Sequence, residues 1–473
     1  MTALQSGAPA FTSGSSVTNG QSVSPAKEGT PWLFAFLCLI IPLLPAYSVP
    51  PGPLKSNGSP SRVIALALCG VMFLGFFLVR RTVKTKTLSP GVLIIIVYFC
   101  IMLGVTGIGM TRVGSALVEA GKTRAMIELF SYVGLALYAT TRVTTFRQRS
   151  IVLGALAIGL TYNCAVGFLQ NTAHIDLHLL LQPPGFVDNQ QDVGGRGIAA
   201  TATDRFGATR AFGTSAHAIE FSMLAAIAVP LTIHFARYAE KKRVRQLAVV
   251  GCGIALLAMP AGVSRTGVGA LAAAFLVYMW TFKLRGLGYA ALAMAGALLA
   301  EFLAAPNTTQ ALWNTIAHSA EDASVLDRVA GIATVAKTFR AHPLFGLGFG
   351  GAPPDEYGFL DNQWLQMIVQ GGSFGLLAMI VVTAGGIFGM SAALRGATNA
   401  RERDQAWALS AMFAGVVVSS FTFDLFGFQQ ATSLFFILFG LLWSSYKVPI
   451  QEPASGRADD GTSFGLPVAR RDL

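Results

Sequence analysis

The sequence predicts an all-α polytopic membrane protein, and three observations support this. Of its 473 residues, 53% are hydrophobic and only 12% are charged, about half the charged share of an ordinary soluble domain. Apolar runs of about 18 residues or more, long enough to cross a bilayer as helices, recur over residues 31–447. They are too long and too uniformly apolar for membrane β-barrel strands, which alternate over about ten residues. Lipid offers the backbone no hydrogen-bond partners, so a helical bundle is the remaining choice.

The apolar runs predict about twelve membrane-spanning helices in one domain over residues 31–447. We expect these helices to begin near Pro31, Arg62, Gly91, Arg124, Ser150, Gly213, Arg245, Gly267, Leu287, Leu360, Gln405 and Gln429. Residues 1–30, rich in Ser, Thr and Gly, and residues 448–473 have the composition of disordered tails.

Alternate links between the runs are basic, which predicts the orientation of the chain. The basic links are residues 80–86, 142–149, 237–245, 283–285 and 395–403. The positive-inside rule assigns them, and both tails, to the cytoplasm. The net charge of +11 is therefore explained by topology, and nucleic acid is not an expected partner.

The opposite, non-cytoplasmic face then carries two long links, at about residues 170–212 and 306–359. Links of this length usually carry function. Residues 325–339 repeat apolar side chains at helical spacing, so we expect an amphipathic helix lying on the bundle or in the membrane interface. No internal repeat stands out, which disfavours a transporter built from inverted halves.

Asp361 and Asn362 open one of the predicted spans. A carboxylate at the membrane surface could take a hydroxyl proton from a bound sugar, which would make Asp361 a general base. Both residue types also cap helix N-termini well, so a structural role is the alternative.

Arg265 lies in a polar interruption, Ser264-Arg265-Thr266, between two apolar runs. An arginine at this depth needs a partner or a water-filled cavity. Its paired donors suit a diphosphate, whereas the structural alternative is an arginine that extends to the outer interface.

His217 and Glu220 follow Arg210 at the start of another span and lie three residues apart, on one helical face. They could bind sugar hydroxyls or orient Arg210, or could form a structural pair. Further cations in the outer links would suit an anionic ligand, and among them Arg328, at the start of the amphipathic helix, is the strongest candidate; the others are Arg196, Arg205 and Arg340.

Three other patterns are weak signals. Residues 346–351 fit G-x-G-x-x-G but have no preceding strand, so they fail as a dinucleotide fingerprint. His174, Asp176 and His178 have metal-ligand types at unsuitable spacing, and we predict no metal and no cofactor. Glu301 is expected at the membrane interface.

Together these segments resemble the O-antigen ligase and O-antigen polymerase superfamily of bacterial membrane glycosyltransferases. The resemblance extends from about Arg210 to Gly375. Its carriers are Arg210 with Gly213-Thr214, residues 217–221, Ser264-Arg265, Arg328, residues 342–350, and Asp361-Asn362 with Gly372 and Gly375. Ligases of the family place His-Asn where this chain has Asp361-Asn362, and Asp at that spacing also resembles peptidoglycan polymerases of the shape, elongation, division and sporulation family.

The resemblance implies a GT-C-like helical bundle in the bacterial inner membrane, with its active site facing the periplasm or cell exterior. It implies a polyprenyl-diphosphate-linked glycan donor, a glycan or lipid acceptor and no metal. Asp361 would be the base, with Arg210, His217, Glu220, Arg265, Arg328 and Asn362 binding substrate. We expect a surface or exopolysaccharide polymerase. The alternatives are a ligase acting on lipid A core, a protein O-oligosaccharyltransferase and, in another class, a polysaccharide or lipid-linked oligosaccharide transporter.

Overall fold

The computed structural model describes residues 29–52, 55–78, 89–188, 204–318, 323–358 and 360–446. The described residues from Pro31 to Tyr446 belong to one compact unit. The predicted disordered tails, at residues 1–30 and 448–473, lie almost wholly outside the described residues.

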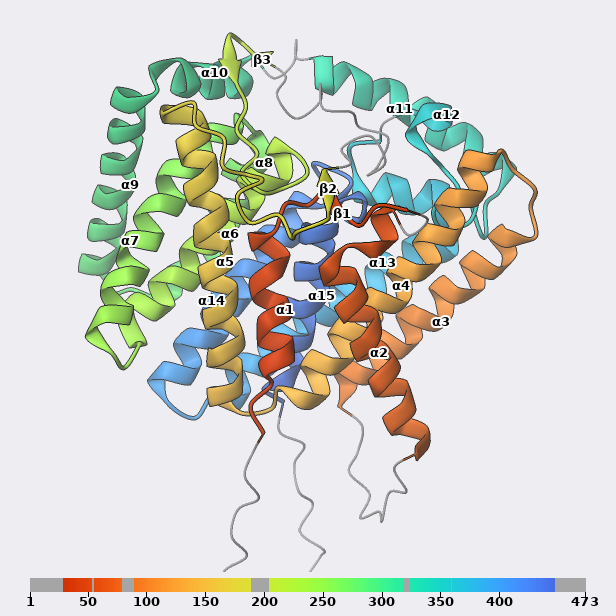
Figure 1. Ribbon diagram of the computed structural model, residues 1–473, viewed down its shortest axis with the longest axis horizontal. Helices are drawn as coiled ribbons and strands as arrows, with labels where there is room; N and C mark the ends of the chain where they lie inside the picture. The colour runs from red at the N-terminus through yellow and green to blue at the C-terminus, as the bar shows by residue number, and fades with distance from the viewer. Residues whose placement is uncertain are drawn as a thin grey trace, which may run out of the picture. The chain divides into compact units, whose positions relative to one another are not determined.

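The regular secondary structure of the described chain is almost entirely helical (Figure 1). Its α-helices are α1 (Trp32–Leu43), α2 (Pro60–Leu78), α3 (Pro90–Met110), α4 (Ala116–Arg142), α5 (Phe146–Thr172), α6 (Ala218–Tyr238), α7 (Lys242–Ala258), α8 (Arg265–Tyr278), α9 (Leu284–Ala304), α10 (Pro306–Ala317), α11 (Ala323–Ala341), α12 (Pro354–Tyr357), α13 (Gln363–Gly396), α14 (Ala400–Ser419) and α15 (Gln429–Ser444). Short 3₁₀ turns are η1 (Lys55–Gly58), η3 (Met259–Gly262), η4 (Met279–Thr281) and η5 (Leu425–Gly427). Two antiparallel pairs join β1 (Ser48–Val49) to β2 (Val187–Asp188) and β3 (Asp204–Arg205) to β4 (Ala208–Thr209).

Each of the roughly twelve predicted spans falls on a helix. Among the described helices, six are long and apolar enough to cross a membrane. They are α3, α5, α6, α7 with η3, α9 and α13. The other predicted spans fall on α1, α2, α4, α8, α14 and α15, which are shorter or less apolar. An all-α fold with several such helices is that of a polytopic membrane protein.

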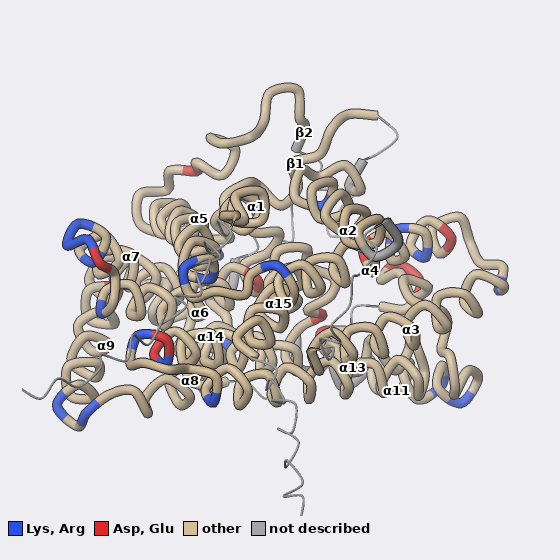
Figure 2. The backbone as a smooth tube through the Cα atoms, turned by 90° about the horizontal axis from the view of Figure 1, so that it is seen from below, with Lys and Arg blue, Asp and Glu red and all other residues tan. Residues whose placement is uncertain are grey.

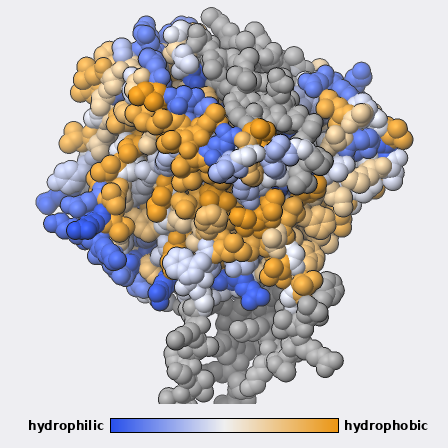
Figure 3. All heavy atoms as spheres, in the orientation of Figure 1, coloured by the Kyte–Doolittle hydropathy of each residue, from blue (hydrophilic) through white to orange (hydrophobic). Residues whose placement is uncertain are grey.

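The core is built around α6 and α15. Nearly every residue of α15 is buried, from Gln430 to Ser444, as expected for a helix that is apolar on all sides. α15 packs on α4 and α13, and α6 packs on α7, α8 and α14. By contrast, α9 buries only Glu301, so its apolar side chains remain on the surface. Figure 3 shows hydrophobic residues across the middle of one face, with hydrophilic residues above and below.

Chain direction separates the two ends of the bundle. α6 ends at the basic link of residues 237–245, α8 ends before Lys283, and α13 ends at Arg395. Figure 2, seen from the side where α1 begins, shows Lys and Arg gathered at turns between helices. The starts of α6, α8 and α13 therefore lie at the end of the bundle opposite these basic links.

The second long link folds onto this opposite end. α10, α11 and α12 lie across the top of the bundle in Figure 1, and α11 packs on α13. The predicted amphipathic helix is thus present within α11, where Val335 is buried and Ile332 is 55% exposed.

The glycine-rich residues 346–351 pack against neighbouring backbones. Gly348 lies so close to Gly109 of α3 that a Cβ on it would stand 2.5 Å from the Gly109 Cα. Gly350 is equally close to Gly121 of α4. α13 breaks at Gly372, with φ 58°, where the amide of Ser373 bonds the carbonyl of Pro343 at 2.8 Å. These glycines allow the loop to enter the break in α13.

Glu301, which was expected at the membrane interface, is buried between helices near the end of α9. Its side chain is 1% exposed, and its Oε1 accepts a 2.8 Å hydrogen bond from Asn171 of α5. Asn171 in turn accepts from Thr308 of α10 at 2.7 Å. The carboxyl therefore ties the α9–α10 corner to α5, because burial is tolerated where a polar group finds a partner.

Candidate active site

The starts of α6, α8, α13 and α15 meet at one segment, residues 419–428, which joins α14 to α15 and contains η5. We call it the 419–428 link. Aligned peptide dipoles give each helix start a partial positive charge, and its first amides lack intrahelical partners. Several helix starts around one link make this end of the bundle favourable for an anion.

The segment before α6 holds Arg210 in a buried position. The Arg210 side chain is 7% exposed, and its Nε donates to the carbonyl of Gly262 at 3.0 Å. The amide of Ala211 bonds the carbonyl of Ala261 at 2.9 Å. These bonds attach Arg210 to η3, whose last residue, Gly262, lies three residues before Arg265.

Gly213 allows this segment to turn against α5. Its φ is +60°, and a Cβ there would stand 2.0 Å from Oδ1 of Asn163. The Asn163 Oδ1 accepts from the amide of Thr214 at 2.8 Å, and Gln170 Oε1 accepts from the amide of Gly213 at 2.8 Å. Only glycine fits this position, since both the backbone angle and the space exclude a side chain.

Arg265 is the first residue of α8 and is half-buried. Val263, two residues earlier, has φ 44° although it is β-branched, and such residues rarely adopt this conformation. Its amide bonds the carbonyl of Pro260 at 2.8 Å. Strained backbone next to a candidate residue is common at functional sites. The turn places the Arg265 backbone at the positive end of α8.

His217 and Glu220 form contacts at the start of α6. His217 caps the helix through Nδ1, which accepts from the amide of Ile219 at 3.2 Å. Glu220 is fully buried; Oε2 accepts from the amide of Ala216 and Oε1 from the amide of Ala431, both at 2.9 Å. Glu220 therefore joins the start of α6 to the start of α15.

Asn362, rather than Asp361, is the cap of α13. The Asn362 Oδ1 accepts from the amides of Trp364 and Leu365 at 2.9 and 3.3 Å. Its Nδ2 donates to the carbonyl of Phe421 at 3.1 Å. Asp361 precedes the cap and is half-buried. The capping alternative for Asp361 is thus taken by its neighbour.

The 419–428 link connects the start of α13 to the start of α8. The indole of Trp364 stacks on Phe421 with ring centroids 5.1 Å apart, and its Nε1 donates to Ser420 at 3.0 Å. On the other side, Thr266 donates to the hydroxyl of Thr422 at 2.9 Å. The segments that carry Asp361 and Arg265 therefore contact neighbouring residues of one link.

The segments that carry most of the predicted site residues thus contact one another or a common neighbour. Arg210 and Arg265 are joined through η3, and the starts of α6, α8 and α13 all contact the 419–428 link or the start of α15. Arg328 lies in α11, but its side chain falls outside the described residues.

Gln363 and the polar residues of the 419–428 link were missed by the sequence analysis. Gln363 is 1% exposed, and its Oε1 accepts from the amide of Phe426 at 2.6 Å. Thr422 and Asp424 are half-buried within the link. The signal was present, because Ser419 to Gln430 interrupts two apolar runs as Ser264-Arg265-Thr266 does.

Two residues of the weak metal pattern, Asp176 and His178, form a local network with Gln170. Asp176 Oδ1 lies 2.7 Å from His178 Nδ1 and accepts from Gln170 at 2.8 Å. Burial raises the pKa of Asp176, but hydrogen bonds from Gln170 and His178 outweigh it and lower that pKa below its ordinary value. In the described part of the chain, no group of three potential metal ligands is found. The network supports the Gly213 turn through Gln170.

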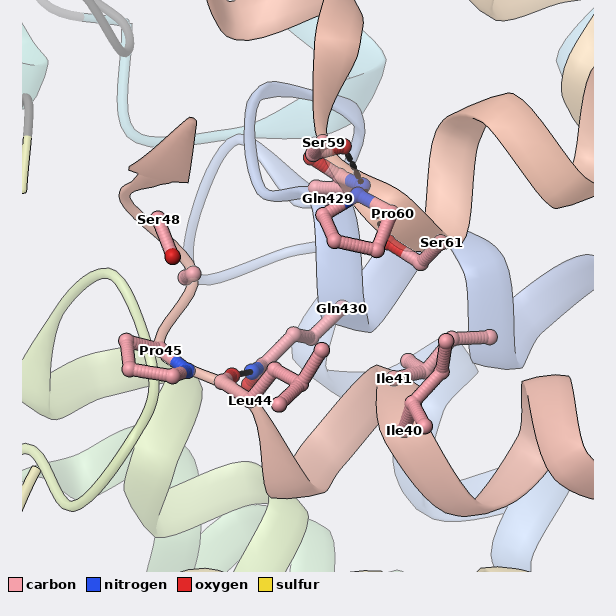
Figure 4. A pocket seen from close by; sticks show the side chains of 11 residues that line it. Ile40, Ile41, Leu44, Pro45, Ser48, Ser59, Pro60, Ser61, Gln429 and Gln430 are labelled. Carbon is pink, nitrogen blue, oxygen red and sulfur yellow. Dashed lines mark hydrogen bonds between the residues drawn. The ribbon is translucent and has the colours of Figure 1, made fainter. Parts of the chain in front are cut away.

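A small cavity lies between the end of α1 and the starts of α2 and α15 (Figure 4). Its polar lining includes Ser48, Ser59, Ser61, Gln429 and Gln430. It has room for one water molecule and is too small for a sugar ring. We therefore do not assign substrate binding to this cavity.

Comparison with known protein families gives one match, over part of the chain. The model of the family described as O-antigen ligase matches residues 250–380. The matched region contains Arg265, Asp361 and Asn362, whereas Arg210, His217 and Glu220 precede it. No curated protein matches the chain.

Proposed function

From the place of residues 250–380 in the O-antigen ligase and polymerase superfamily, we propose that this membrane protein joins polyprenyl-diphosphate-linked glycan units on the outer face of the inner membrane. The family implies glycosyltransferase activity of the ligase or polymerase type. Within it, we propose a surface or exopolysaccharide polymerase, because Asp361 stands where ligases of the family have histidine.

The observation that carries the proposal is the meeting of four helix starts at the 419–428 link. An activated glycan donor is a diphosphate ester, so its leaving group gains negative charge as the glycosidic bond breaks. Helix starts and arginines are suited to stabilise such charge, most strongly where water is excluded. Arg210, which is buried beside η3, and Arg265, at the start of α8, supply the two cations.

The proposed reaction is a direct displacement at the anomeric carbon. Asp361 takes the proton from an acceptor hydroxyl, whose oxygen forms a bond to the anomeric carbon. The bond from that carbon to the diphosphate oxygen breaks, and its electron pair leaves on the polyprenyl diphosphate. Arg210 and Arg265 stabilise this leaving group, and Arg328 is proposed as a further donor contact. The Asp361 carboxylate suits the base role because Asn362 fulfils the capping role.

Three further residues are proposed to shape the substrate site by holding helix starts in place. They are His217, Glu220 and Asn362. Glu220 uses both oxygens on backbone amides, so its contribution is to hold the start of α6 against α15. His217 and Asn362 each use an acceptor atom for a cap, and Asn362 also donates to the carbonyl of Phe421, so they fix the helix starts between which the sugar would bind.

The polar residues favour an enzyme over a transporter. Alternating access usually places ionisable groups near the bilayer midplane at broken helices. Here Arg210, Arg265 and Asp361 all precede or begin helices at one end of the bundle.

The test uses purified protein with a radiolabelled polyprenyl-diphosphate oligosaccharide. A ladder of lengthened lipid-linked glycans, with release of polyprenyl diphosphate, would support a polymerase. One transfer to added lipid A core would identify a ligase, and label on an added protein a protein transferase. Movement of the donor across a vesicle without a new glycosidic bond would overturn the enzyme proposal.

A further inference from the structure

A buried charged cluster joins three helices at the end of the bundle opposite the candidate site. Asp404 of α14 is 3% exposed. Its Oδ2 lies 2.7 Å from Nδ1 of His234 and accepts from the hydroxyl of Tyr278 at 3.0 Å. Its Oδ1 accepts from Arg237 at 2.5 Å. His234 and Arg237 belong to α6 and Tyr278 to α8, so the carboxylate joins α14 to two other helices.

Arg237 extends the cluster to the turn that follows α8. Its Nη1 also donates to the hydroxyl of Thr281 at 2.9 Å. Its guanidinium lies over the ring of Phe282, 5.3 Å from the centroid. The cluster therefore fixes the end of α8 from both α6 and α14.

The same three helices carry candidate site residues at their other ends. α6 begins next to His217, α8 begins with Arg265, and α14 leads into the 419–428 link. From Arg265 to Tyr278 the helix is about 20 Å long at 1.5 Å per residue. A rigid helix transmits a displacement at one end to the other.

Between their two ends, α6, α8 and α14 are closely packed against one another. A Cβ on Gly267 of α8 would stand 2.6 Å from Cβ of Ser222 in α6. One on Gly415 of α14 would stand 3.1 Å from the carbonyl oxygen of Ala270 in α8. Helices in such contact slide as units rather than bend, because interiors are close-packed.

We propose that Asp404 is a positioning residue, which sets the register of α6, α8 and α14 and thereby the place of Arg265 beside the 419–428 link. A slip of one helical turn would move Arg265 by about 5.4 Å. It would also bury Asp404 away from its three donors, which is strongly unfavourable for a carboxylate. Fixing register is the best-attested role of buried polar groups. The catalytic consequence rests on the proposed function, but the register does not.

The register can be measured independently of activity. Thr266 and Thr422 lie 2.9 Å apart through their hydroxyls, so cysteines at both positions should form a disulfide under mild oxidation. Asp404→Ala in this double-cysteine chain should reduce the linked fraction by half or more, as measured by mass spectrometry of the linked peptides. In the threonine background, Asp404→Ala should raise the KM for donor and lower turnover about 10- to 100-fold.

Two further variants keep the test decisive. Tyr278→Phe removes one donor to Asp404 without changing the shape of the side chain. It should lower the cross-linked fraction and raise the KM for donor, each by less than Asp404→Ala does. This variant keeps the test informative even if Asp404→Ala folds poorly. Glu240→Ala breaks the exposed Arg401–Glu240 pair at the same end, and should change neither. Unchanged cross-linking and KM in folded Asp404→Ala and Tyr278→Phe would overturn the proposal. Altered cross-linking with no transferase activity in the parent chain would leave the register role standing and refute the proposed function.

Discussion

The Oε1 atom of Gln363 accepts a 2.6 Å hydrogen bond from the backbone amide of Phe426. Gln363 is the first residue of α13, and Phe426 lies in η5, 63 residues later. The amide of Gln363 also bonds the carbonyl of Ser420 at 2.9 Å. One residue thus fixes the start of α13 to both ends of the 419–428 link, and so determines where the neighbouring Asp361 lies.

Gln363→Ala should therefore destabilise the protein. Gln363 is 1% exposed, so the change would leave the Phe426 amide buried without its partner, at a cost of about 1–3 kcal/mol. Thermal unfolding in detergent measures this, with Gln310→Ala, on the exposed side of α10, as the control. Equal melting temperatures for the two variants would contradict the assigned contact.

Replacement by alanine should have opposite effects on stability at two glycines, one at the break in α13 and one in α7. Gly372 has φ 58°, and a Cβ there would stand 2.6 Å from the carbonyl carbon of Leu344. Gly372→Ala should cost at least about 1–2 kcal/mol from the backbone conformation alone. Gly253→Ala, in α7, meets nothing within 4 Å and should stabilise by up to about 1 kcal/mol. Thermal unfolding of both variants checks this; a stable Gly372→Ala protein would refute the inserted-loop arrangement.

The orientation in the membrane is tested by labelling single cysteines. In a chain without its five native cysteines, Asp355→Cys should react in intact cells with a reagent that cannot cross membranes. Arg403→Cys, in the first turn of α14, should react only after permeabilisation. Both positions are exposed, so protection cannot be attributed to burial. The reverse pattern would assign the candidate site to the cytoplasmic face.

Much of this arrangement could be predicted from the sequence. Apolar length predicted the helices, and basic links predicted which helix ends lie together. The partners of individual side chains could not be predicted. Nothing in the pattern around Glu220 indicates that Ala431, 211 residues later, donates to it. Asp361 and Asn362 were equal candidates for the cap until the Asn362 contacts separated them. The burial of Glu301 could not be predicted either, because its partner Asn171 is contributed by a helix that is distant in the sequence.

Arg265 is predicted to act through paired donors as well as charge. Arg265→Ala should reduce turnover of lipid-linked donor by about 10²–10³-fold, the usual effect of losing one group that stabilises developing negative charge. Arg265→Lys keeps the charge but loses the paired donor geometry, so its turnover should lie between that of the parent chain and that of Arg265→Ala. Arg340→Ala, an exposed arginine at the end of α11, is the matched control. Full turnover by Arg265→Ala at equal protein levels would make Arg265 a structural residue.

The last prediction concerns Asp361 as the general base. Asp361→Asn replaces the carboxylate by a neutral amide of the same shape, which cannot accept the acceptor's proton. Loss of a general base costs about 10²–10⁴-fold in turnover. Because Asn362 makes the capping contacts, the variant keeps the cap of α13 and should still bind donor through its arginines; its melting temperature is measured alongside turnover.

Asn362→Ala is the complementary variant, because it removes the cap of α13 and keeps the carboxylate that Asp361→Asn removes. Loss of the cap should lower stability by about 1 kcal/mol, while the chain keeps the Asp361 carboxylate. The two substitutions therefore separate chemistry from folding at adjacent positions. Asp361→His tests the same role, since an imidazole can also accept a proton and should restore part of the activity that Asp361→Asn loses. Near-normal turnover by a fully folded Asp361→Asn protein would remove Asp361 from the reaction, and Asp424 of the 419–428 link would then be the next carboxylate to test.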